Sequence, residues 1–267
     1  MNRRSTYVII FIIVTIILYM VEKYIDRQNE EYPELTDTSY RMDYTLLPTS
    51  TTNTVIEHNY YTLSYSEDHE QAEWVAYELL TDHLSENDFE RPHFVEDRKV
   101  LSKSADWRNY KGSGYDRGHL CPAGDRRFSY EAYHETFLTS NISPQDHKFN
   151  AGIWNRLEQK TRYWAKIFDG VFVVTGGILN NSKKRIGKEN VTVPDSFFKI
   201  ILTYSKNEFM TIAFIMPNEA SKESIYNYVT TIDEVEMRTG IDFFHQLEDS
   251  IEDVLESTKD PINWSEY

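Results

Sequence analysis

Four consecutive residues near the middle of the chain carry groups suited to acid–base and phosphate chemistry. They are Asp116, Arg117, Gly118 and His119, so a carboxylate, a guanidinium and an imidazole stand side by side. Alternate side chains of an extended strand share a face, which predicts that Arg117 and His119 point the same way. Repulsion from Arg117 would keep the imidazole of His119 neutral, as a general base requires. The alternative for so short a motif is a turn with a hydrogen-bonded histidine.

A second polar segment, residues 140–162, reads SNISPQDHKFNAGIWNRLEQKTR. Its residues Asn141, Asn150, Glu158 and Arg162 are hard to explain by packing alone. Asn150 and Glu158 would lie about 12 Å apart along a helix axis, so both cannot easily bind one metal directly. One of them could bind a metal while the other holds a metal-bound water. Glu158 and Arg162 would share a helix face, where the alternative is a surface salt bridge of little energetic value.

Short runs rich in Val, Ile, Tyr and Phe predict the strands that must carry these groups. The clearest runs lie at residues 60–65, 73–79, 170–175, 197–204 and 209–216. No apolar gap or Gly/Ser linker divides them. The sequence therefore predicts a single α+β domain over residues 54–260.

Two helices are predicted alongside the strands. In the first, over residues 150–166, the apolar positions recur at spacings of three and four and define one face. That face consists of Trp154, Leu157, Thr161, Trp164 and Phe168. Asn150 stands at the expected start and is a favoured N-cap type. The second helix is expected over residues 219–238, where Gly240 is placed to end it.

The composition limits the possible functions. A chain of 267 residues that is 40% hydrophobic and has only 10 Gly and 8 Pro is neither disordered nor collagen-like. The single cysteine, Cys121, excludes an intrachain disulfide framework and a zinc site built on several thiolates. The formal net charge of −15 should repel nucleic acid from the molecule as a whole. However, residues 103–166 carry eleven Lys or Arg and seven Asp or Glu, so a polyanion would be bound on this mildly basic island or through a cation.

The N-terminus contains an uncharged apolar run, residues 7–21, which follows Arg3 and Arg4. At ~1.5 Å per residue the run is about 22 Å long, short of a ~30 Å hydrocarbon core unless its neighbours extend it. No small-x-small cleavage site follows, so an uncleaved signal or membrane anchor over residues 1–25 is expected; a cleaved signal peptide is the alternative. Residues 26–53 are rich in acidic and turn-forming residues and are expected to form a flexible tether.

The two arginines before the apolar run favour a cytoplasmic N-terminus. The expected location is therefore that of a single-pass, membrane-anchored protein whose folded domain is extracytoplasmic. The alternatives are a secreted or periplasmic protein after signal cleavage, and a mitochondrial protein.

Six longer phrases make the sequence recognisable, and their likeness to a known family covers residues 55–245. They read SGYDRGHLCPAGDRR, ETFLTSNISPQ, NAGIWNRLE, VFVVTGGI, VPDSFFKIIL and VEMRTGIDFF. Together they resemble the DNA/RNA non-specific endonucleases, the ββα-metal family that includes the Serratia nuclease and mitochondrial endonuclease G. The resemblance implies an α+β fold with a central antiparallel β-sheet flanked by helices and a ββα-metal catalytic motif. It also implies Mg²⁺-dependent hydrolysis of phosphodiester bonds in DNA and RNA, without sugar preference, leaving 5′-phosphate ends.

The resemblance further implies a role for each matching residue. His119 matches the histidine that removes a proton from the attacking water. Asn150 matches the one side chain that binds Mg²⁺ directly, with Mn²⁺ as a substitute ion. Glu158 matches a glutamate that orients metal-bound water. Cys121 stands where a small residue such as alanine is frequent, so packing rather than chemistry is expected there.

The remaining matches are cations and supporting groups. Arg117 and Arg162 match cations near the scissile phosphate or the leaving group. Asn141 matches a supporting asparagine, and Asp116 matches a residue that braces the motif. Arg91 is expected to correspond to an upstream arginine that stabilises the transition state.

Two other functions stay open at this point. A catalytically silent nucleic-acid-binding protein could keep the fold, although it would have no need of His119, Asn150 and Glu158 together. A phosphodiesterase for a non-polymeric substrate would use the same reacting group. The expected partners are DNA and RNA, with a membrane at residues 7–21. The family includes dimers, so a homodimer is open, and no residue identifies an inhibitor protein.

Overall fold

The computed structural model describes residues 46–180, 182–205 and 208–265, and the fold is given for these residues alone. The expected anchor at residues 1–25 and most of the expected tether at residues 26–53 lie outside the described residues. The end of the tether region contacts the domain, because the backbone N–H of Thr51 donates to the Glu73 carboxylate over 3.0 Å. No helix within the described ranges is long and apolar enough to cross a membrane.

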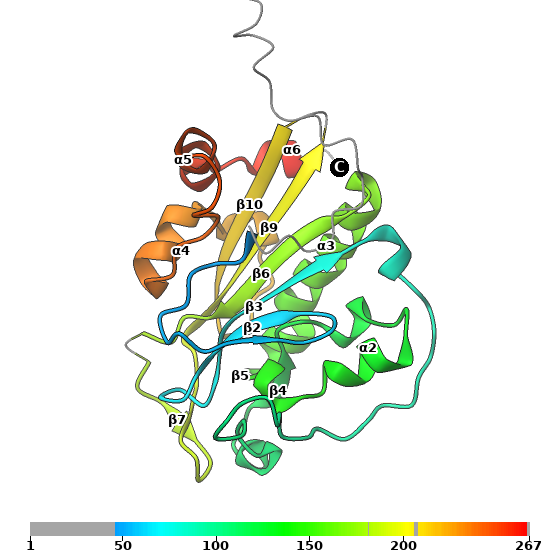
Figure 1. Ribbon diagram of the computed structural model, residues 1–267, viewed down its shortest axis with the longest axis vertical. Coiled ribbons are helices and arrows are strands. Elements are labelled where there is room, and N and C mark those ends of the chain that lie inside the picture. Colours follow the sequence, from blue (N-terminus) through cyan, green and yellow to red (C-terminus); the bar gives the residue numbers. More distant parts are fainter. Residues whose placement is uncertain (1–45, 181, 206–207, 266–267) are drawn as a thin grey trace, which may run out of the picture. The chain divides into compact units, whose positions relative to one another are not determined.

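Seven antiparallel strands form the central sheet of the domain (Figure 1). In spatial order they are β1 (Val55–Glu57), β2 (Thr62–Ser66), β3 (Gln71–Leu79), β6 (Val171–Gly177), β9 (Ser196–Ser205), β10 (Glu208–Pro217) and β11 (Val229–Thr230). The five predicted strand regions correspond to β2, β3, β6, β9 and β10. The antiparallel sheet and its strands are therefore confirmed.

Helices, single turns and two short strand pairs surround this sheet. The α-helices are α2 (Tyr130–Glu135), α3 (Asn155–Phe168), α4 (Ile232–Thr239), α5 (Asp249–Ser257) and α6 (Pro261–Ser265). The 3-10 turns are η2 (Thr81–His83), η3 (Trp107–Tyr110), η4 (Ala123–Asp125), η5 (Thr139–Asn141) and η7 (Ile225–Tyr228), and η6 (Phe149–Trp154) is a π-helix. Two separate antiparallel pairs join β4 (Asp116–His119) to β5 (Ile142–Gln145) and β7 (Arg185–Ile186) to β8 (Val191–Thr192).

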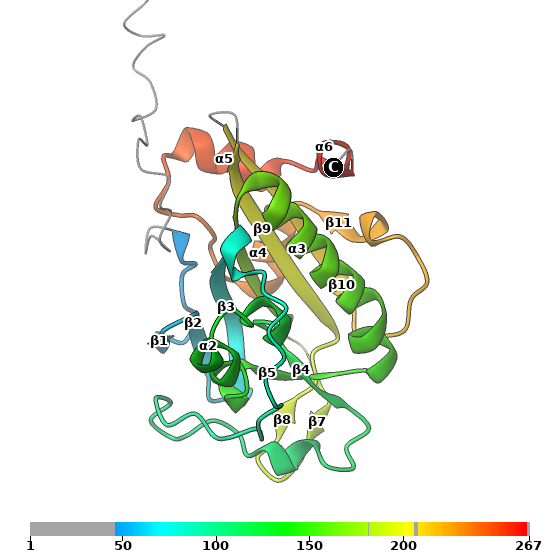
Figure 2. The same ribbon diagram turned by 90° about the vertical axis from the view of Figure 1, so that its right-hand side faces the viewer.

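Both faces of the central sheet are buried. On β9, Phe197 and Ile201 enter the core on one face, whereas Phe198 and Ile200 enter the core on the other, as the alternation of a strand requires. Trp164 of α3 packs in the first core, and α4 and α5 contribute to the second, so helices cover the sheet on either side (Figures 1 and 2). Full burial of each such apolar side chain stabilises the fold by about 1.5–3 kcal/mol.

The first predicted helix forms, but it begins later than expected. The predicted face is confirmed, because α3 buries Leu157, Thr161 and Trp164. The predicted N-cap is wrong: Asn150 lies inside the π-helix η6, and the backbone of Gly152 (φ −104°, ψ −107°) departs from helical geometry there. Asp146 takes the capping role instead, since its Oδ1 accepts hydrogen bonds from two following backbone N–H groups. The side chain of Asn150 is therefore not used to cap the helix.

The second predicted helix, over residues 219–238, is wrong up to residue 231. Val229 and Thr230 pair with β10 and extend the sheet, so pairing with a neighbouring strand overrides the helical pattern in this stretch. The α-helix begins only after Thr231, whose hydroxyl caps it by accepting a hydrogen bond from the N–H of Glu234 (3.2 Å). Gly240 ends the helix in the left-handed conformation (φ 73°), as predicted.

Candidate active site

The strand predicted at Asp116–His119 is β4, and it belongs to a small ββα unit. It pairs antiparallel with β5, which is followed along the chain by η6 and α3 (Figure 2). Gly118 permits this pairing, because a Cβ atom there would lie 2.1 Å from the side-chain oxygen of Gln145. The glycine of the motif is thus required by a close approach of two strands, and it fixes where the neighbouring His119 is held.

Five of the predicted site residues line one pocket of about 620 Å³. They are Arg91, His119, Asn150, Glu158 and Arg162, and they come from a loop, β4, η6 and α3. The other three predicted residues, Asp116, Arg117 and Asn141, do not line this pocket and contact its surroundings instead. The structure therefore brings together groups that lie up to 71 positions apart in the sequence.

His119 is, within the described part of the chain, the only histidine that lines this pocket. Its ring lies 4.9 Å from that of Phe137, and its Nε2 atom is buried without a hydrogen-bond partner among the described residues. Burial, and then the positive charge of Arg91, lower the pKa of His119 to about 3. The imidazole is therefore neutral at physiological pH and able to accept a proton.

The neutral state of His119 has a different cause from the one expected. The sequence argument assigned the repulsion to Arg117, the neighbour on the same strand face, but burial and Arg91 are responsible. The guanidinium of Arg117 instead lies over the ring of Phe94, 4.9 Å from its centre, and 5.7 Å from that of Trp107. Arg117 thus lies beside the pocket and packs against the rings of Phe94 and Trp107.

Asp116 determines how Asn150 is presented to the pocket. Its Oδ2 atom accepts a hydrogen bond of 2.9 Å from the Nδ2 of Asn150, and another of the same length from His147. With the amide nitrogen engaged, the carbonyl oxygen of Asn150 receives no hydrogen bond from the described residues. Asp116 thus braces the amide and leaves one neutral oxygen available as a ligand.

The side chain of Glu158 is more buried than it would be in a surface salt bridge. Only 15% of its side chain is exposed, and burial raises its pKa to about 7 although the positive charges of Lys199 and Arg162 oppose this. Arg162 lies 3.7 Å from Glu158, but its shorter contact is with the buried carboxylate of Asp125, at 2.5 Å. The predicted pair exists, and it forms part of a larger buried charge cluster.

Sequence reasoning missed two members of this charge cluster, Asp125 and Lys199. Lys199 on β9 is fully buried, its Nζ lacks a hydrogen-bond partner among the described residues, and it lies 4.8 Å from the centre of the Trp154 ring. Asp125 is 1% exposed and also accepts a hydrogen bond from the hydroxyl of Tyr77. The available signal was a lysine within the apolar run FFKIIL, because an isolated charge in a buried strand must have a compensating partner.

Asn141 supports the site from outside the pocket. It is fully buried, and its side chain accepts a hydrogen bond from the N–H of Cys121 (2.8 Å) and donates to the carbonyls of Cys121 and Thr136. These bonds hold the chain immediately after His119 in place. Cys121 itself is buried in the core, which agrees with the packing role expected for it.

The donor set of the pocket fits a hydrated Mg²⁺ ion. Asn150 offers a free carbonyl oxygen and Glu158 a carboxylate, while the unpartnered Nε2 of His119 leaves a buried polar atom to be satisfied. Mg²⁺ binds oxygen ligands and usually keeps several waters, so it needs few protein ligands. In the described part of the chain, the triads of carboxylates that could share an ion lie around Glu256, and none of them lines this pocket.

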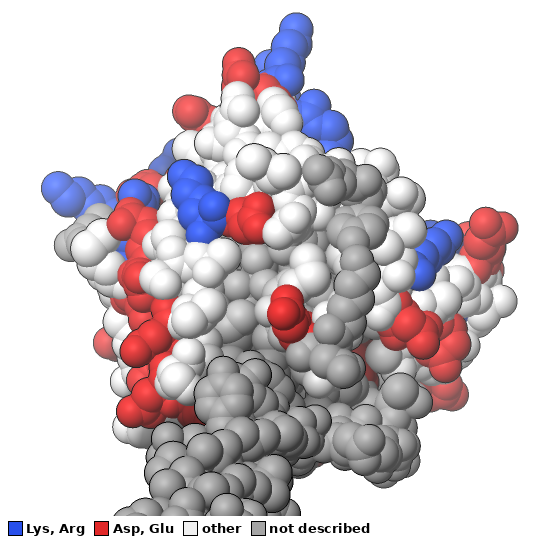
Figure 3. All heavy atoms as spheres, turned by 90° about the horizontal axis from the view of Figure 1, so that it is seen from above, with Lys and Arg blue, Asp and Glu red and all other residues white. Residues whose placement is uncertain are grey.

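The charge of the molecule is unevenly distributed. In Figure 3, acidic side chains gather on the left and right sides of the end of the domain that carries α5 and α6, and basic side chains are scattered around the edge. The pocket near α3 is lined by three arginines, Arg91, Arg127 and Arg162, and by three carboxylates, those of Asp88, Glu90 and Glu158. The pocket is thus balanced in formal charge rather than basic, on a chain whose net charge is −15.

Comparisons with known proteins agree with this geometry. A family model described as DNA/RNA non-specific endonuclease matches residues 39–250. Nuclease C1 of Cunninghamella echinulata var. echinulata is 36% identical over 210 residues, which cover 72% of this chain and 83% of that protein. The mitochondrial nuclease EXOG of Xenopus laevis is 39% identical over 160 residues, 54% of this chain, and the matched region spans 45% of that relative.

A solved structure resembles most of the described domain. It is a crystal structure of an EndoG/EndoGI complex that concerns EndoG inhibition, with a TM-score of 0.69 and 30% identity. The match covers 74% of this chain and 88% of the other. The antiparallel sheet flanked by helices, with a ββα unit beside the pocket, is the fold of the ββα-metal nucleases. The chain belongs to the DNA/RNA non-specific endonuclease family. The family, the α+β fold and the endonuclease class predicted from the sequence are confirmed.

The location predicted from the sequence is corrected by these comparisons. We expected a single-pass membrane protein with an extracytoplasmic catalytic domain, whereas the EXOG relative is named as mitochondrial. The prediction rested on residues 7–21, which lie outside the described residues. The physical reason for the error is length: at about 22 Å the run falls short of a ~30 Å bilayer core.

Proposed function

We propose that this protein is a Mg²⁺-dependent endonuclease that hydrolyses phosphodiester bonds in both DNA and RNA and leaves 5′-phosphate ends. The observation that carries the proposal is the shared pocket. His119, Asn150 and Glu158 meet there with Arg91 and Arg162, although they come from separate segments of the chain. A base, a metal-binding amide and cations beside one cavity match the needs of phosphodiester hydrolysis.

His119 is the proposed general base. Its neutral imidazole would accept the proton of a water placed against the phosphorus, and such proton transfer contributes about 10²–10⁴-fold to the rate. The bonds that Asn141 makes to Cys121 support this role, because they hold the backbone next to the imidazole. Positioning matters as much as protonation state, since misplacement of a base by about 1 Å costs ~10²-fold.

The residues that would hold the ion are Asn150, directly through its carbonyl oxygen, and Glu158 through a water. When bound there, Mg²⁺ would supply positive charge against the negative charge that develops on the phosphoryl oxygens. Asp116 supports this arrangement by occupying the amide nitrogen of Asn150. Mn²⁺ has the same preference for oxygen ligands and is the proposed substitute ion.

The arginines are the proposed phosphate ligands. Arg91 and Arg162 line the pocket, where a planar guanidinium can bind two oxygens of one phosphate. Arg162 is held in place by Asp125, so it is positioned before the substrate arrives. Arg117 stands beside the pocket, and we assign it to a neighbouring phosphate of the strand. No proposed group requires a 2′-hydroxyl, which is why both sugars are expected to react.

The test is cleavage of supercoiled plasmid DNA and of single-stranded RNA by the purified full chain, with Mg²⁺ and with EDTA. We expect EDTA to abolish cleavage, and His119→Ala and Asn150→Ala to lower it by about 10²–10⁴-fold. His245→Ala is the matched control, because His245 is exposed on another part of the domain. Undiminished cleavage by His119→Ala would remove the proposed base. Binding of nucleic acid without any cleavage by the wild type would favour a silent binding protein.

A further inference from the structure

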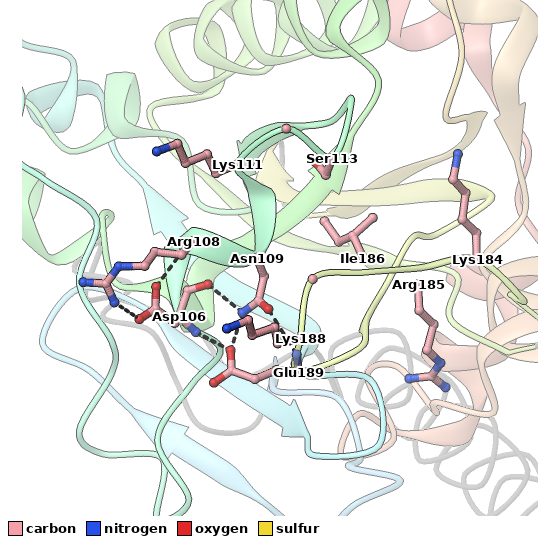
Figure 4. Close-up of a pocket in the computed structure, with 12 residues that line it drawn as sticks. Asp106, Arg108, Asn109, Lys111, Ser113, Lys184, Arg185, Ile186, Lys188 and Glu189 are labelled. Carbon is pink, nitrogen blue, oxygen red and sulfur yellow. Dashed lines mark hydrogen bonds and ion pairs between the residues drawn. The ribbon is translucent and has the colours of Figure 1, made fainter.

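A second pocket, with a volume of about 740 Å³, lies outside the proposed active site (Figure 4). It lies between the segment around η3 and the β7–β8 hairpin. The charged residues that line it are Asp106, Arg108, Lys111, Lys184, Arg185, Lys188 and Glu189. Five cations therefore face two carboxylates, on a chain whose overall charge is −15. Its volume falls within the ~300–1,000 Å³ of typical ligand pockets.

The base of this pocket is held by hydrogen bonds, because Asn109 joins its two walls. The side-chain amide of Asn109 donates to the Glu189 carboxylate and to the backbone carbonyl of Asp106, and its oxygen accepts from the N–H of Glu189 (3.1 Å) (Figure 4). Gly187 makes the approach possible: its φ is +71°, and a Cβ atom there would lie 2.1 Å from the Asn109 oxygen. The hairpin is thus docked onto the η3 segment at a fixed place.

The two carboxylates of the pocket are already satisfied, and the cations are in excess. Asp106 forms an ion pair with Arg108, and Glu189 accepts hydrogen bonds from Asn109 and from the N–H of Asp106 (2.8 Å). The ammonium groups of Lys111 and Lys188 are exposed and have no hydrogen-bond or ion-pair partner among the described residues. Positive charge that is not neutralised within the protein is available for an anion.

A row of contacts connects this pocket to the proposed active site. The guanidinium of Arg108 lies 5.3 Å from the centre of the Trp107 ring, and Arg117 lies 5.7 Å from the same ring. Arg117 also lies 4.9 Å from the ring of Phe94, whose centre is 5.6 Å from that of His119. Guanidinium groups and aromatic rings therefore alternate from one pocket to the other. Such a row suits a polynucleotide strand, because the rings hold the arginines in line and the arginines can contact successive phosphates.

We propose that the pocket between η3 and the β7–β8 hairpin binds the phosphate backbone of the nucleic-acid strand at a distance from the bond being cleaved. This inference rests on the proposed function. It answers a physical problem that the active site alone leaves open, since a chain with a net charge of −15 repels a polyanion at long range. Lys111 and Lys188 would anchor the strand, and the row that leads through Arg117 would direct it to His119.

The experiment compares two double variants with equal changes in net charge. Lys111→Gln with Lys188→Gln removes the two free cations of the pocket, and Lys222→Gln with Lys259→Gln removes two exposed lysines elsewhere. Binding of fluorescein-labelled single-stranded DNA is measured by anisotropy in EDTA, with oligonucleotides of about 4 and about 20 nucleotides. The thermal unfolding midpoint of each variant verifies that it is folded.

We expect the pocket variant to bind the longer oligonucleotide about tenfold more weakly than the control variant does, with little difference for the shorter one. Its log–log salt slope should be shallower by about 1.4, because each single-strand phosphate contact contributes ~0.7. Equal binding by the two double variants, in a preparation whose wild type cleaves DNA or RNA, would overturn this inference alone. Absence of cleavage by the wild type would instead overturn the proposed function.

Discussion

Asp116 and Asn150, which come from β4 and from the π-helix, are joined by a hydrogen bond of 2.9 Å between a carboxylate oxygen and an amide nitrogen. The bond links the first strand of the ββα unit to the proposed metal ligand. It explains why an aspartate that does not line the pocket belongs to the same motif as His119. A residue in this position controls the orientation of the ligand rather than the reaction itself.

The first prediction concerns this bond. Asp116→Ala should raise the Mg²⁺ concentration needed for half-maximal cleavage by about 10–100-fold, because the amide of Asn150 loses its orientation. Asp116→Asn keeps an acceptor oxygen and should be affected less. His147→Ala is the control, since His147 contacts the same oxygen but not Asn150. A Mg²⁺ dependence unchanged in Asp116→Ala would show that the bond has no such role.

The second prediction separates two arginines by their effect on the pKa of His119. Arg91 lowers that pKa, so Arg91→Gln should raise it, whereas Arg117→Gln should leave it unchanged. A base is active above its pKa, and the low value therefore keeps His119 neutral down to about pH 3. The measurement is an NMR titration of labelled histidine in the metal-free protein, with Arg98→Gln as a control from the same loop. A change in the His119 pKa caused by Arg117→Gln alone would restore the explanation suggested by the sequence.

The third prediction is that removing the charge of Lys199 lowers both activity and stability. Its ammonium group is fully buried near the carboxylates of Glu158 and Asp125, and removal of one partner from a buried charge cluster leaves a buried carboxylate uncompensated. Lys199→Met should therefore unfold at a lower urea concentration than the wild type. The substitution should also raise the pKa of Glu158 above about 7, because a neighbouring positive charge is lost. Protonation of Glu158 should then weaken cleavage at neutral pH by up to about tenfold.

Activity of Lys199→Met should recover as the pH is raised, because Glu158 again becomes a carboxylate. The exposed Lys166→Met provides the matched control and should leave both properties unchanged. Loss of activity at every pH, with no recovery in alkaline buffer, would indicate a role other than compensation of the Glu158 charge.

The fourth prediction concerns the pH dependence of folding stability at a buried pair. His58 and Asp97 are joined at 2.9 Å with 2% of each side chain exposed. Burial lowers the pKa of His58, but hydrogen bonds to Asp97 and Glu135 outweigh it, so the pKa is raised. Its stabilising contribution is then fully present below the unfolded value of about 6.5 and is lost as pH rises through the folded pKa.

Asp97 acts in the opposite sense at lower pH. Burial raises its pKa, but hydrogen bonds from His58 and Ser140 lower it overall, so its contribution is lost as pH falls through the folded value. Urea unfolding should thus show a stability loss on the alkaline side that is absent in His58→Ala. That variant should be less stable by about 3 kcal/mol near pH 6, because a buried charge loses its partner. Parallel pH profiles for the two proteins would contradict this account.

The sequence predicts those features that depend on local pattern. The strands around Val75, Val173 and Ile201 follow from runs of β-branched and aromatic residues, and the buried face of α3 follows from its spacing. The long motif around His119 identifies most of the pocket. What the sequence does not show is which charge stands next to which after folding. Arg91, rather than the adjacent Arg117, acts on His119 because a loop folds back over the strand.

The errors have the same origin in long-range contacts. Asn150 fails as an N-cap because Asp146 already accepts the backbone N–H groups, and residues 229–230 leave the predicted helix because β10 offers them a partner. Lys199 was assigned to an ordinary strand because its neighbours in space, Glu158 and Asp125, are distant in sequence. Local propensity could not reveal these relations.

Because of the π-helix at Phe149–Trp154, the geometry of this site depends on the number of residues between positions 150 and 158. In an uninterrupted α-helix, positions 150 and 158 would be rotated by about 80° relative to one another, whereas here both side chains reach one cavity. The number of residues between them is therefore part of the catalytic geometry. A single deletion in this interval would uncouple the two side chains while every chemical group of the site remained present, whereas a substitution that preserves the backbone length would keep them in phase.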